Sequence, residues 1–166
     1  MQTRTSQKTY RAFRIQYQAN QLFEDLCVCA KNLYNRATYL VRQEFFKNGK
    51  WLQYTVLYHQ LKTKPVYLAL KELTDSYIPQ QVLRLVEQAW RSFFNAVKAW
   101  KKEPEKFQTK PRPPGYKPKN GMQIISLPKP RVRIRNSTIC FPKNLVKRGF
   151  PQIPMGTFPF SDNTTI

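Results

Sequence analysis

Five prolines lie within fifteen residues near the middle of the chain, and they limit the folds that it can adopt. A proline inside a helix or a central strand removes a backbone hydrogen bond, so this segment is expected to form neither. Proline also favours an extended backbone, and the lysines and arginines between the prolines repel one another along it. We therefore predict a basic, extended linker over residues 104–121, with prolines at Pro104, Pro111, Pro113, Pro114 and Pro118.

The residues before this linker have the spacing of amphipathic helices. Apolar side chains recur at three- and four-residue steps from Gln18 to about Phe46, and Asn48-Gly49 is a helix stop. Shorter helices are predicted over residues 54–62 and 66–73. Residues 18–103 as a whole are predicted to form a small helical bundle, because short connections place successive helices side by side.

The last of these helices has the strongest pattern and begins near Ser76 or Tyr77. Pro79 fits its first turn, where the missing N–H would have had no partner. The apolar residues recur at helical spacing along one broad face, which is expected to pack in the core. That predicted face consists of Val82, Leu85, Val86, Ala89, Phe93, Ala96, Val97 and Trp100.

Alternating patterns typical of strands occur on both sides of the helical region. Residues 9–17 are predicted to form a first strand, and residues 122–148 to form the remaining ones. Within the second group, strands are expected over Met122–Leu127, Arg131–Arg135 and Thr138–Phe141, with a tight turn at Asn136-Ser137. Residues 149–166 have no period and are expected to be a disordered tail. The predicted fold class is therefore α+β.

The net charge of +20 at pH 7 is extreme for 166 residues, and it is uneven. Residues 1–97 contain fourteen Lys and Arg against six acids, and residues 98–148 contain fifteen against two. Charge of this size opposes a compact state unless a polyanion offsets it. DNA, RNA or an anionic membrane surface is therefore the expected partner class.

A membrane is the weaker of these alternatives. No apolar run approaches the roughly 20 residues that a spanning helix requires, and the first residues lack the apolar core of a signal peptide. The three cysteines, Cys27, Cys29 and Cys140, are odd in number and imply no disulfide framework. They are expected to be small buried residues of a cytoplasmic protein.

Aromatic side chains are interleaved with the cations in residues 90–119, which favours a polyanion that has bases to stack on. Trp90 and Phe94 lie off the centre of the predicted apolar face, so they are candidates for base stacking, with core packing as the alternative. Arg91 and Lys98 are seven residues apart and therefore share a face of the helix. They are either phosphate contacts or solvated charges.

The linker and the second strand group provide the other candidates. Linker cations near aromatics are typical of phosphate contacts, although a solvated linker remains an alternative. Alternating arginines on a strand either contact nucleic acid or protect a sheet edge from aggregation. The candidates in these two segments are Lys110, Arg112, Tyr116, Lys117, Lys119, Arg131, Arg133 and Arg135.

The order of motifs resembles the N-terminal part of TnpB (OrfB), an insertion-sequence protein family related to type V CRISPR effectors. The resemblance covers roughly Tyr10 to Leu145. It is based on a β segment and long helix with LYNRATYL (33–40), the run YIPQQVLRLVEQAWRSFFNAVKAW (77–100), the arm KPRPPGYKPKNG (110–121) and the short segments IISL and VRIRNSTICFP. It implies a wedge-type β-barrel interrupted by a helical recognition lobe.

Members of that family are RNA-guided DNA endonucleases that hold a guide RNA–DNA heteroduplex and recognise a short motif flanking the target. Such proteins leave target sequence to base pairing and themselves contact backbone and shape. The resemblance implies DNA and guide RNA as partners. It also makes Gln80, Gln81 and Arg84 candidate readers of the flanking motif, because Gln pairs with adenine and Arg with guanine.

The chain departs from the family where cleavage is concerned. The family's RuvC-like nuclease domain, with its metal-binding carboxylates and zinc ribbon, follows the region of resemblance. Residues 104–166 contain only Glu105 and Asp162, and the CVC sequence at residues 27–29 has no second cysteine pair. No catalytic residue, metal or cofactor is therefore expected in this chain, which is interpreted as truncated before the nuclease.

Three functions are left open by the sequence. The first is nucleic-acid binding by a TnpB-like protein that lacks its own nuclease site. The second is a part in an active RNA-guided endonuclease that is completed by a C-terminal RuvC-like domain. The alternative to this second function is that the chain is a non-functional transposon remnant. The third is a basic scaffold for an acidic protein or a membrane surface.

Overall fold

The computed structural model describes residues 21–127 and 132–154 of the chain. The first predicted strand, over residues 9–17, lies outside the described residues, and so do Arg131 and residues 155–166. Within the described part, helices and a small open sheet are both present, which confirms a mixed helical and strand fold.

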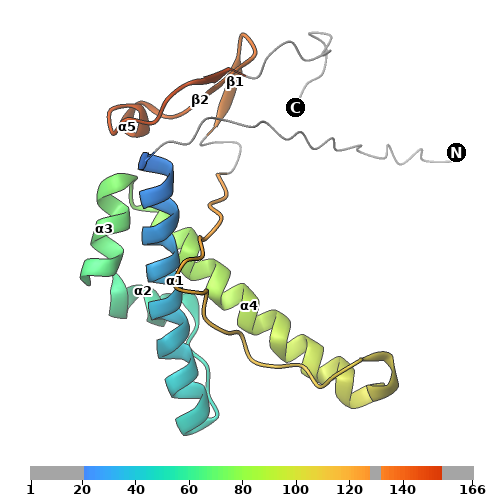
Figure 1. The fold of residues 1–166 in the computed structure, drawn as a ribbon. Helices are drawn as coiled ribbons and strands as arrows, with labels where there is room; N and C mark the ends of the chain where they lie inside the picture. Colours follow the sequence, from blue (N-terminus) through green and yellow to red (C-terminus); the bar gives the residue numbers. More distant parts are fainter. Residues whose placement is uncertain (1–20, 128–131, 155–166) are drawn as a thin grey trace, which may run out of the picture.

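Four helices pack around one apolar core (Figure 1). Their bounds are α1 Gln21–Asn48, α2 Tyr54–Leu61, α3 Pro65–Leu73 and α4 Tyr77–Lys102, close to the predicted ranges. The predicted stop after α1 is confirmed, because Gly49 has a φ of +66° and its N–H donates to the Phe45 carbonyl at 2.9 Å. Pro65 and Pro79 occupy the first turns of α3 and α4.

The core follows from the apolar spacing of the helices. On α1, buried residues recur at three- and four-residue steps at Leu26, Ala30, Leu33, Ala37 and Val41. Each leucine or valine of this set that leaves water contributes about 1.5–3 kcal/mol before entropy is subtracted, and the alanines contribute less. The helices are therefore held together chiefly by burial of one shared apolar face.

The buried face of α4 differs from the predicted one. Leu83 and Trp90 are fully buried although the predicted face omitted both, and no residue of α4 beyond Trp90 is buried. Ala96, Val97 and Trp100 are half-buried, because the end of α4 extends away from the other helices (Figure 1). The apolar face predicted to continue to Trp100 therefore enters the core only over its first half.

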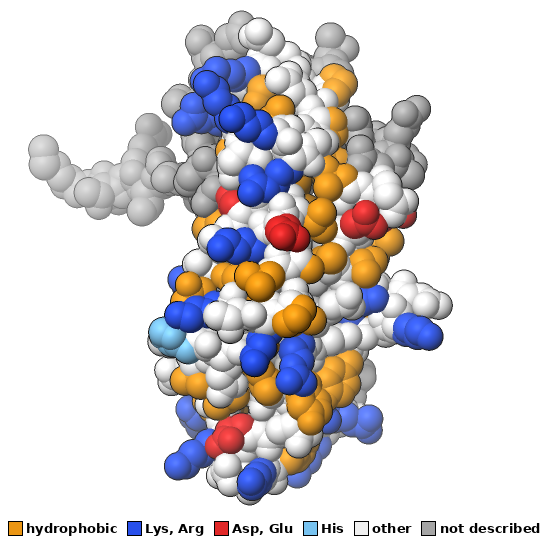
Figure 2. Space-filling model, turned by 90° about the vertical axis from the view of Figure 1, so that its left-hand side faces the viewer, with side chains coloured by type: hydrophobic (Ala, Val, Ile, Leu, Met, Phe, Trp, Pro, Cys, Tyr) orange, Lys and Arg blue, Asp and Glu red, His pale blue; other side chains and the backbone are white. Residues whose placement is uncertain are grey.

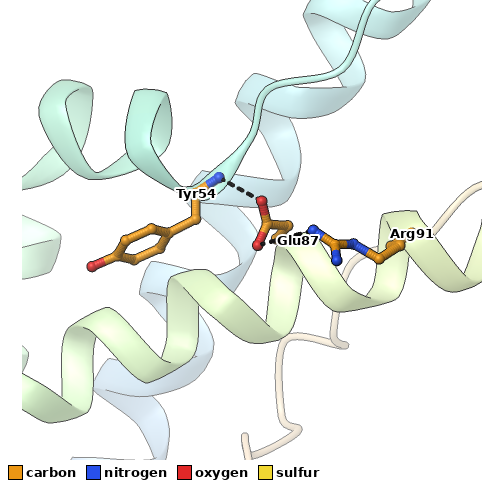
Figure 3. Close-up of polar contacts among 3 residues, drawn as sticks. All are labelled: Tyr54, Glu87 and Arg91. Atoms are coloured by element: carbon orange, nitrogen blue, oxygen red, sulfur yellow. Dashed lines mark hydrogen bonds and ion pairs between the residues drawn. The ribbon is translucent and has the colours of Figure 1, made fainter.

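The first turn of α2 is stabilised by a side chain from α4 (Figure 3). Gln53, at the N-terminal cap of α2, makes no side-chain capping bond. Instead, the Tyr54 N–H donates to Oε1 of Glu87 at 3.1 Å. A carboxylate at this end of a helix satisfies a free N–H and complements the helix dipole, so Glu87 fixes α2 against α4.

A three-stranded antiparallel sheet has the order β1-β2-β3, with β1 Arg133–Arg135, β2 Thr138–Cys140 and β3 Ile153–Pro154. Asn136 and Ser137 both have positive φ values, 47° and 52°, as a two-residue type I′ hairpin turn requires. The tight turn predicted there is confirmed. The sheet is open.

The C-terminal half differs from the prediction over residues 122–127 and over residues 149–154. Residues 122–127 form no strand, and the Gln123 N–H instead donates to the Cys27 carbonyl of α1 at 3.3 Å. The irregular tail predicted from Gly149 contributes to ordered structure as far as Pro154, because Phe150 is buried and β3 pairs with β2. Each of these two segments is too short for its sequence pattern to show which part of the protein it will contact.

The sheet is attached to the helices through α5, Lys143–Val146. Leu145 and Phe150 are buried in the core, and Phe150 contacts Phe23 of α1 with ring centroids 5.6 Å apart. Arg148 donates from Nε to the Glu72 carbonyl at the end of α3 at 2.8 Å. The C-terminal segment therefore lies at the end of the bundle where α1 begins (Figure 1).

Candidate nucleic-acid interface

The proline-rich segment after α4 lies along α1 instead of extending freely as a linker. A short 3-10 helix, η1 (Pro104–Lys106), follows α4, and the chain then turns back toward α1 (Figure 1). We call residues 110–123 the strap. It has neither helix nor strand, as the prolines predicted, and it runs antiparallel to α1 from Arg42 to Cys27.

Polar side chains of α1 hold the strap by its backbone. Asn35 makes two bonds to Lys117: its Nδ2 donates to the Lys117 carbonyl at 3.0 Å, and its Oδ1 accepts from the Lys117 N–H at 2.8 Å. Nη1 of Arg42 donates to the Pro114 carbonyl at 2.8 Å. Because these contacts use strap backbone, the side chains of the strap are left for other partners.

At a turn in the strap, a fourth hydrogen bond joins a side chain of α1 to the strap backbone. Nζ of Lys31, which is 7% exposed, donates to the Lys119 carbonyl at 2.6 Å. This bond satisfies an ammonium that is otherwise shielded from water. The turn closes where the Gly121 N–H donates to the Pro118 carbonyl, and a Cβ at Gly121 would lie 2.8 Å from Cγ of Pro118. Glycine is therefore required there.

All four predicted strap cations are exposed and lie on one docked segment. Nζ of Lys110 lies 5.4 Å from the ring centroid of Trp100, and Nζ of Lys117 lies 5.4 Å from that of Tyr34. Among residues 21–127 and 132–154, the ion pairs are Arg91–Glu87 and Lys106–Glu103. The positive charges of Lys110, Arg112, Lys117 and Lys119 are thus not neutralised by described carboxylates.

The candidates on the second half of α4 separate into buried and exposed residues. Trp90 is 0% exposed, so the prediction that it stacks on bases is wrong: it is a core residue. Phe94 is half-buried in an aromatic cluster and lies 5.7 Å from both Phe45 and Trp51, measured between ring centroids. Arg91 and Lys98 are exposed, and Arg91 pairs with Glu87 at 3.8 Å (Figure 3).

The candidate readers Gln80, Gln81 and Arg84 lie on the first half of α4 and do not join the strap. Gln80 is half-buried and lies near Tyr67 of α3, where its amide lowers the pKa of the Tyr67 hydroxyl. Arg84 is exposed, and its guanidinium carbon lies 4.4 Å from the ring centroid of Tyr54 of α2. Gln81 is half-buried. Gln80 and Arg84 therefore face the α2 and α3 side of the helix.

Arg133 and Arg135 are exposed on β1, at one edge of the sheet. The apolar residue between them, Ile134, is 49% exposed, so β1 has no buried face. This placement is compatible with both predicted roles, a nucleic-acid contact and a charged edge that resists aggregation.

Sequence reasoning missed a row of arginine and aromatic residues on α1. Arg36, Tyr39, Arg42 and Phe46 recur at three- and four-residue steps on one side of the helix. The guanidinium carbon of Arg36 lies 5.2 Å from the ring centroid of Tyr39, and that of Arg42 lies 5.1 Å from Phe46 and 5.5 Å from Tyr116. The three- and four-residue spacing of this row is visible in the sequence. The prediction for this helix used only its apolar residues.

Positive charge also extends beyond the strap. On the face shown in Figure 2, Lys and Arg side chains are spread from one end to the other among hydrophobic ones, with few acids between them. A shallow groove of about 340 Å³ is lined by Arg36 and Lys64 over Leu40, Gln60 and Leu61. Arg36 therefore links the row on α1 to further cationic surface.

Burial decides the chemistry of the helical cysteines. It raises the pKa of both the Cys27 and the Cys29 thiols, with Asp25 adding to the shift at Cys29. Both thiols are therefore protonated near neutral pH and are poor nucleophiles or metal ligands. In the part of the chain that the structure describes, no three His, Cys, Asp or Glu side chains are grouped for a metal.

None of the helices within residues 21–127 and 132–154 has the length and apolarity needed to cross a membrane. Comparison with known proteins adds no family: no protein-family model matches the chain, and no curated protein is similar enough to count as a relative. The function therefore has to be argued from the geometry of the strap and of α1.

Proposed function

We propose that this protein binds nucleic acid through the strap and the adjoining side of α1. The observation that supports this most directly is the docking of the strap by its backbone, which leaves Lys110, Arg112, Lys117 and Lys119 exposed. A row of cations without carboxylate partners matches a chain of phosphates, and its affinity comes from the release of counterions.

Docking also lowers the cost of binding. A free basic linker would lose backbone and side-chain entropy when it is ordered on a polyanion. The strap is already held to α1 by the bonds from Lys31, Asn35 and Arg42, so its backbone needs little further ordering. This distinguishes the strap from a disordered basic tail of the same composition.

We further propose that the chain is the recognition and wedge region of a TnpB-like protein, with guide RNA and target DNA as its partners in the cytoplasm or nucleoid. Supporting this is the order of elements: a long helix, shorter helices, a second long helix, a basic arm and a hairpin. On this proposal the open sheet is part of a wedge-type β-barrel, and nuclease chemistry belongs to a RuvC-like domain outside this chain.

The binding proposal is tested by titrating the protein with duplex DNA, RNA and heparin across a salt series. The test variant changes the four strap cations to Gln. The matched control changes four exposed lysines outside the strap to Gln: Lys50, Lys71, Lys143 and Lys147. We expect the strap variant to lose about 3.6 units of the slope of log K against log salt on duplex DNA, because each phosphate contact contributes about 0.9, and the control to lose clearly less. A salt-independent affinity, or equal losses in both variants, would contradict the proposal.

The finer TnpB-like proposal needs a separate comparison. Structured RNA from a transposon end and an unrelated RNA of equal length are titrated at physiological salt. Preferential binding of the transposon-end RNA would support a guide-binding role. Equal, salt-labile binding of both RNAs and heparin would leave general polyanion binding and remove the guide-specific part.

A further inference from the structure

One side of α1 presents aromatic rings to solvent next to arginines. Tyr39 is 41% exposed, Phe46 is 62% exposed, and Tyr116 of the strap is 51% exposed. The core residues of α1, such as Leu33, Ala37 and Val41, lie on another side of the helix. Exposed aromatic surface of this size is not explained by packing within the described structure, and such surfaces usually mark binding sites.

Arginines hold these rings in position. The Arg42 guanidinium lies near both Phe46 and Tyr116, at 5.1 and 5.5 Å from their centroids, and its Nη1 is bonded to the Pro114 carbonyl. The next residue of the strap after Tyr116 is Lys117, which is fixed by its two bonds to Asn35. The rings of Phe46, on α1, and Tyr116, on the docked strap, therefore belong to one fixed surface.

We propose that Arg36, Tyr39, Arg42, Phe46 and Tyr116 form a stacking platform for unpaired bases of single-stranded nucleic acid. This inference rests on the proposed function, since the strap cations supply the phosphate contacts. Bases stack on aromatic rings and on guanidinium planes whatever their sequence, because every base has a π-face. In a duplex the faces of the bases are covered by their neighbours, so a duplex offers this platform phosphates alone.

The length of the platform sets the number of nucleotides. Tyr39 and Phe46 are seven residues apart, which is about 10 Å along a helix axis. Successive bases in a stacked strand are about 3.4 Å apart. The platform therefore addresses about three nucleotides, beside the phosphate contacts of Lys117 and Lys119.

The test compares three ligands of equal length at one salt concentration, of which the two single strands also carry equal charge. They are a single strand carrying 2-aminopurine, the same strand with three abasic sites in its centre, and the strand annealed to its complement. We expect the intact strand to bind at least about tenfold more tightly than the abasic strand, and 2-aminopurine fluorescence to be quenched on binding. Equal affinity for the intact and abasic strands would overturn the platform.

Two variants assign the effect to the rings. Changing Tyr39, Phe46 and Tyr116 to Leu preserves apolar bulk but removes the aromatic faces, and we expect the preference for intact over abasic strand to disappear. Changing Tyr39 and Tyr116 to Phe keeps the rings and should keep the preference. If the Leu variant keeps both the preference and the quenching, the platform is wrong.

The platform and the binding function fail in different ways. If the wild-type protein binds all three ligands equally, and this binding weakens when the titrations are repeated at higher salt, the platform fails and phosphate binding stands. If it binds none of them, and heparin does not bind either, the proposed function fails together with the platform. Circular dichroism of each variant confirms that the helices remain, as expected for substitutions at exposed positions.

Discussion

Asn35 is the residue that fixes the middle of the strap on α1. It makes two hydrogen bonds to the backbone of Lys117, one as donor and one as acceptor. An amide offers a donor and an acceptor at once, which neither an ionised carboxylate nor an ammonium group does. Together with the bonds from Lys31 and Arg42, this side chain determines where the exposed residues of the strap are placed.

Asn35→Ala is expected to release this part of the strap. The loss of two hydrogen bonds should lower the free energy of unfolding by about 1–2 kcal/mol and speed amide exchange at Lys117. Asn32→Ala is the control, because Asn32 is exposed on the same helix and gains the same helix propensity. Urea unfolding and hydrogen exchange measure both effects. Similar results for the two variants would show that the strap is not held by Asn35.

Tyr67 predicts a dependence of stability on alkaline pH. Burial, together with the neighbouring Tyr58 hydroxyl, raises its pKa from 10.0 to about 12, while the nearby Gln80 amide lowers it in part. The folded state therefore keeps its proton at pH values where the unfolded chain has lost it. The stability contributed by protonated Tyr67 is complete below pH 10 and is lost between pH 10 and about 12.

The measurement compares wild type with Tyr67→Phe by urea unfolding at about pH 9 and about pH 11.5. We expect wild type to lose more stability than the variant between these values, because the variant has no phenol to ionise. Titration of lysines affects both proteins alike and cancels in the comparison. Parallel losses would mean that Tyr67 is not shielded in the folded state.

At the scale of elements, α2 depends on α4 for its first turn. Glu87 accepts from the Tyr54 N–H at 3.1 Å and pairs with Arg91 at 3.8 Å (Figure 3). Glu87→Gln removes the charge from the N-terminus of α2 and should lower the free energy of unfolding by about 0.5–1 kcal/mol. The same change releases Arg91, so affinity for polyanions should rise.

Glu44→Gln is the matched control for this prediction. Glu44 accepts from Nδ2 of Asn48 within α1, so its loss also removes one acid but leaves α2 untouched. Unfolding by urea and binding to heparin separate the two effects. A Glu87→Gln protein as stable as the Glu44→Gln protein would refute the role of Glu87 in capping α2.

The role of Trp90 in α4 is also testable at this scale. Its side chain is fully buried against Phe45, with ring centroids 5.1 Å apart. Trp90→Ala should therefore cost about 3–5 kcal/mol of stability through the cavity it leaves. Trp90→Phe should fold and bind nucleic acid with unchanged affinity, because the indole does not reach the surface. A selective loss of binding by the folded Trp90→Phe protein would restore Trp90 as a contact residue.

At the scale of the whole molecule, the C-terminal segment shares the core of the helices. Leu145 is fully buried, and Phe150 packs between Phe23 and Phe141. We expect Leu145→Ala to lower the stability of the helices as well as the sheet, by about 2–5 kcal/mol in one transition. Val146→Ala is the control, since the neighbouring Val146 is exposed. Separate transitions for helices and sheet would contradict a shared core.

Much of the local structure could be predicted because it depends on near neighbours. Helix bounds, the stop at Gly49 and the turn at Asn136-Ser137 follow from spacing and backbone preference within a few residues. The failures have a different cause. The alternating residues 122–127 lie against α1, and the pattern of a few residues cannot show which partner a backbone will find.

In the candidate site, too, some features depend on single residues and others depend on contacts between distant parts of the chain. The sequence by itself determined that the strap is extended and cationic, because proline geometry and side-chain charge are properties of single residues. The tertiary structure decided that Trp90 is buried, that Gln80 faces Tyr67 and that the strap is docked on α1 beside Tyr39, Arg42 and Phe46. These placements depend on contacts between residues far apart in the sequence, 88 positions for Lys31 and Lys119. Local pattern does not encode such contacts, because packing chooses among many compatible neighbours.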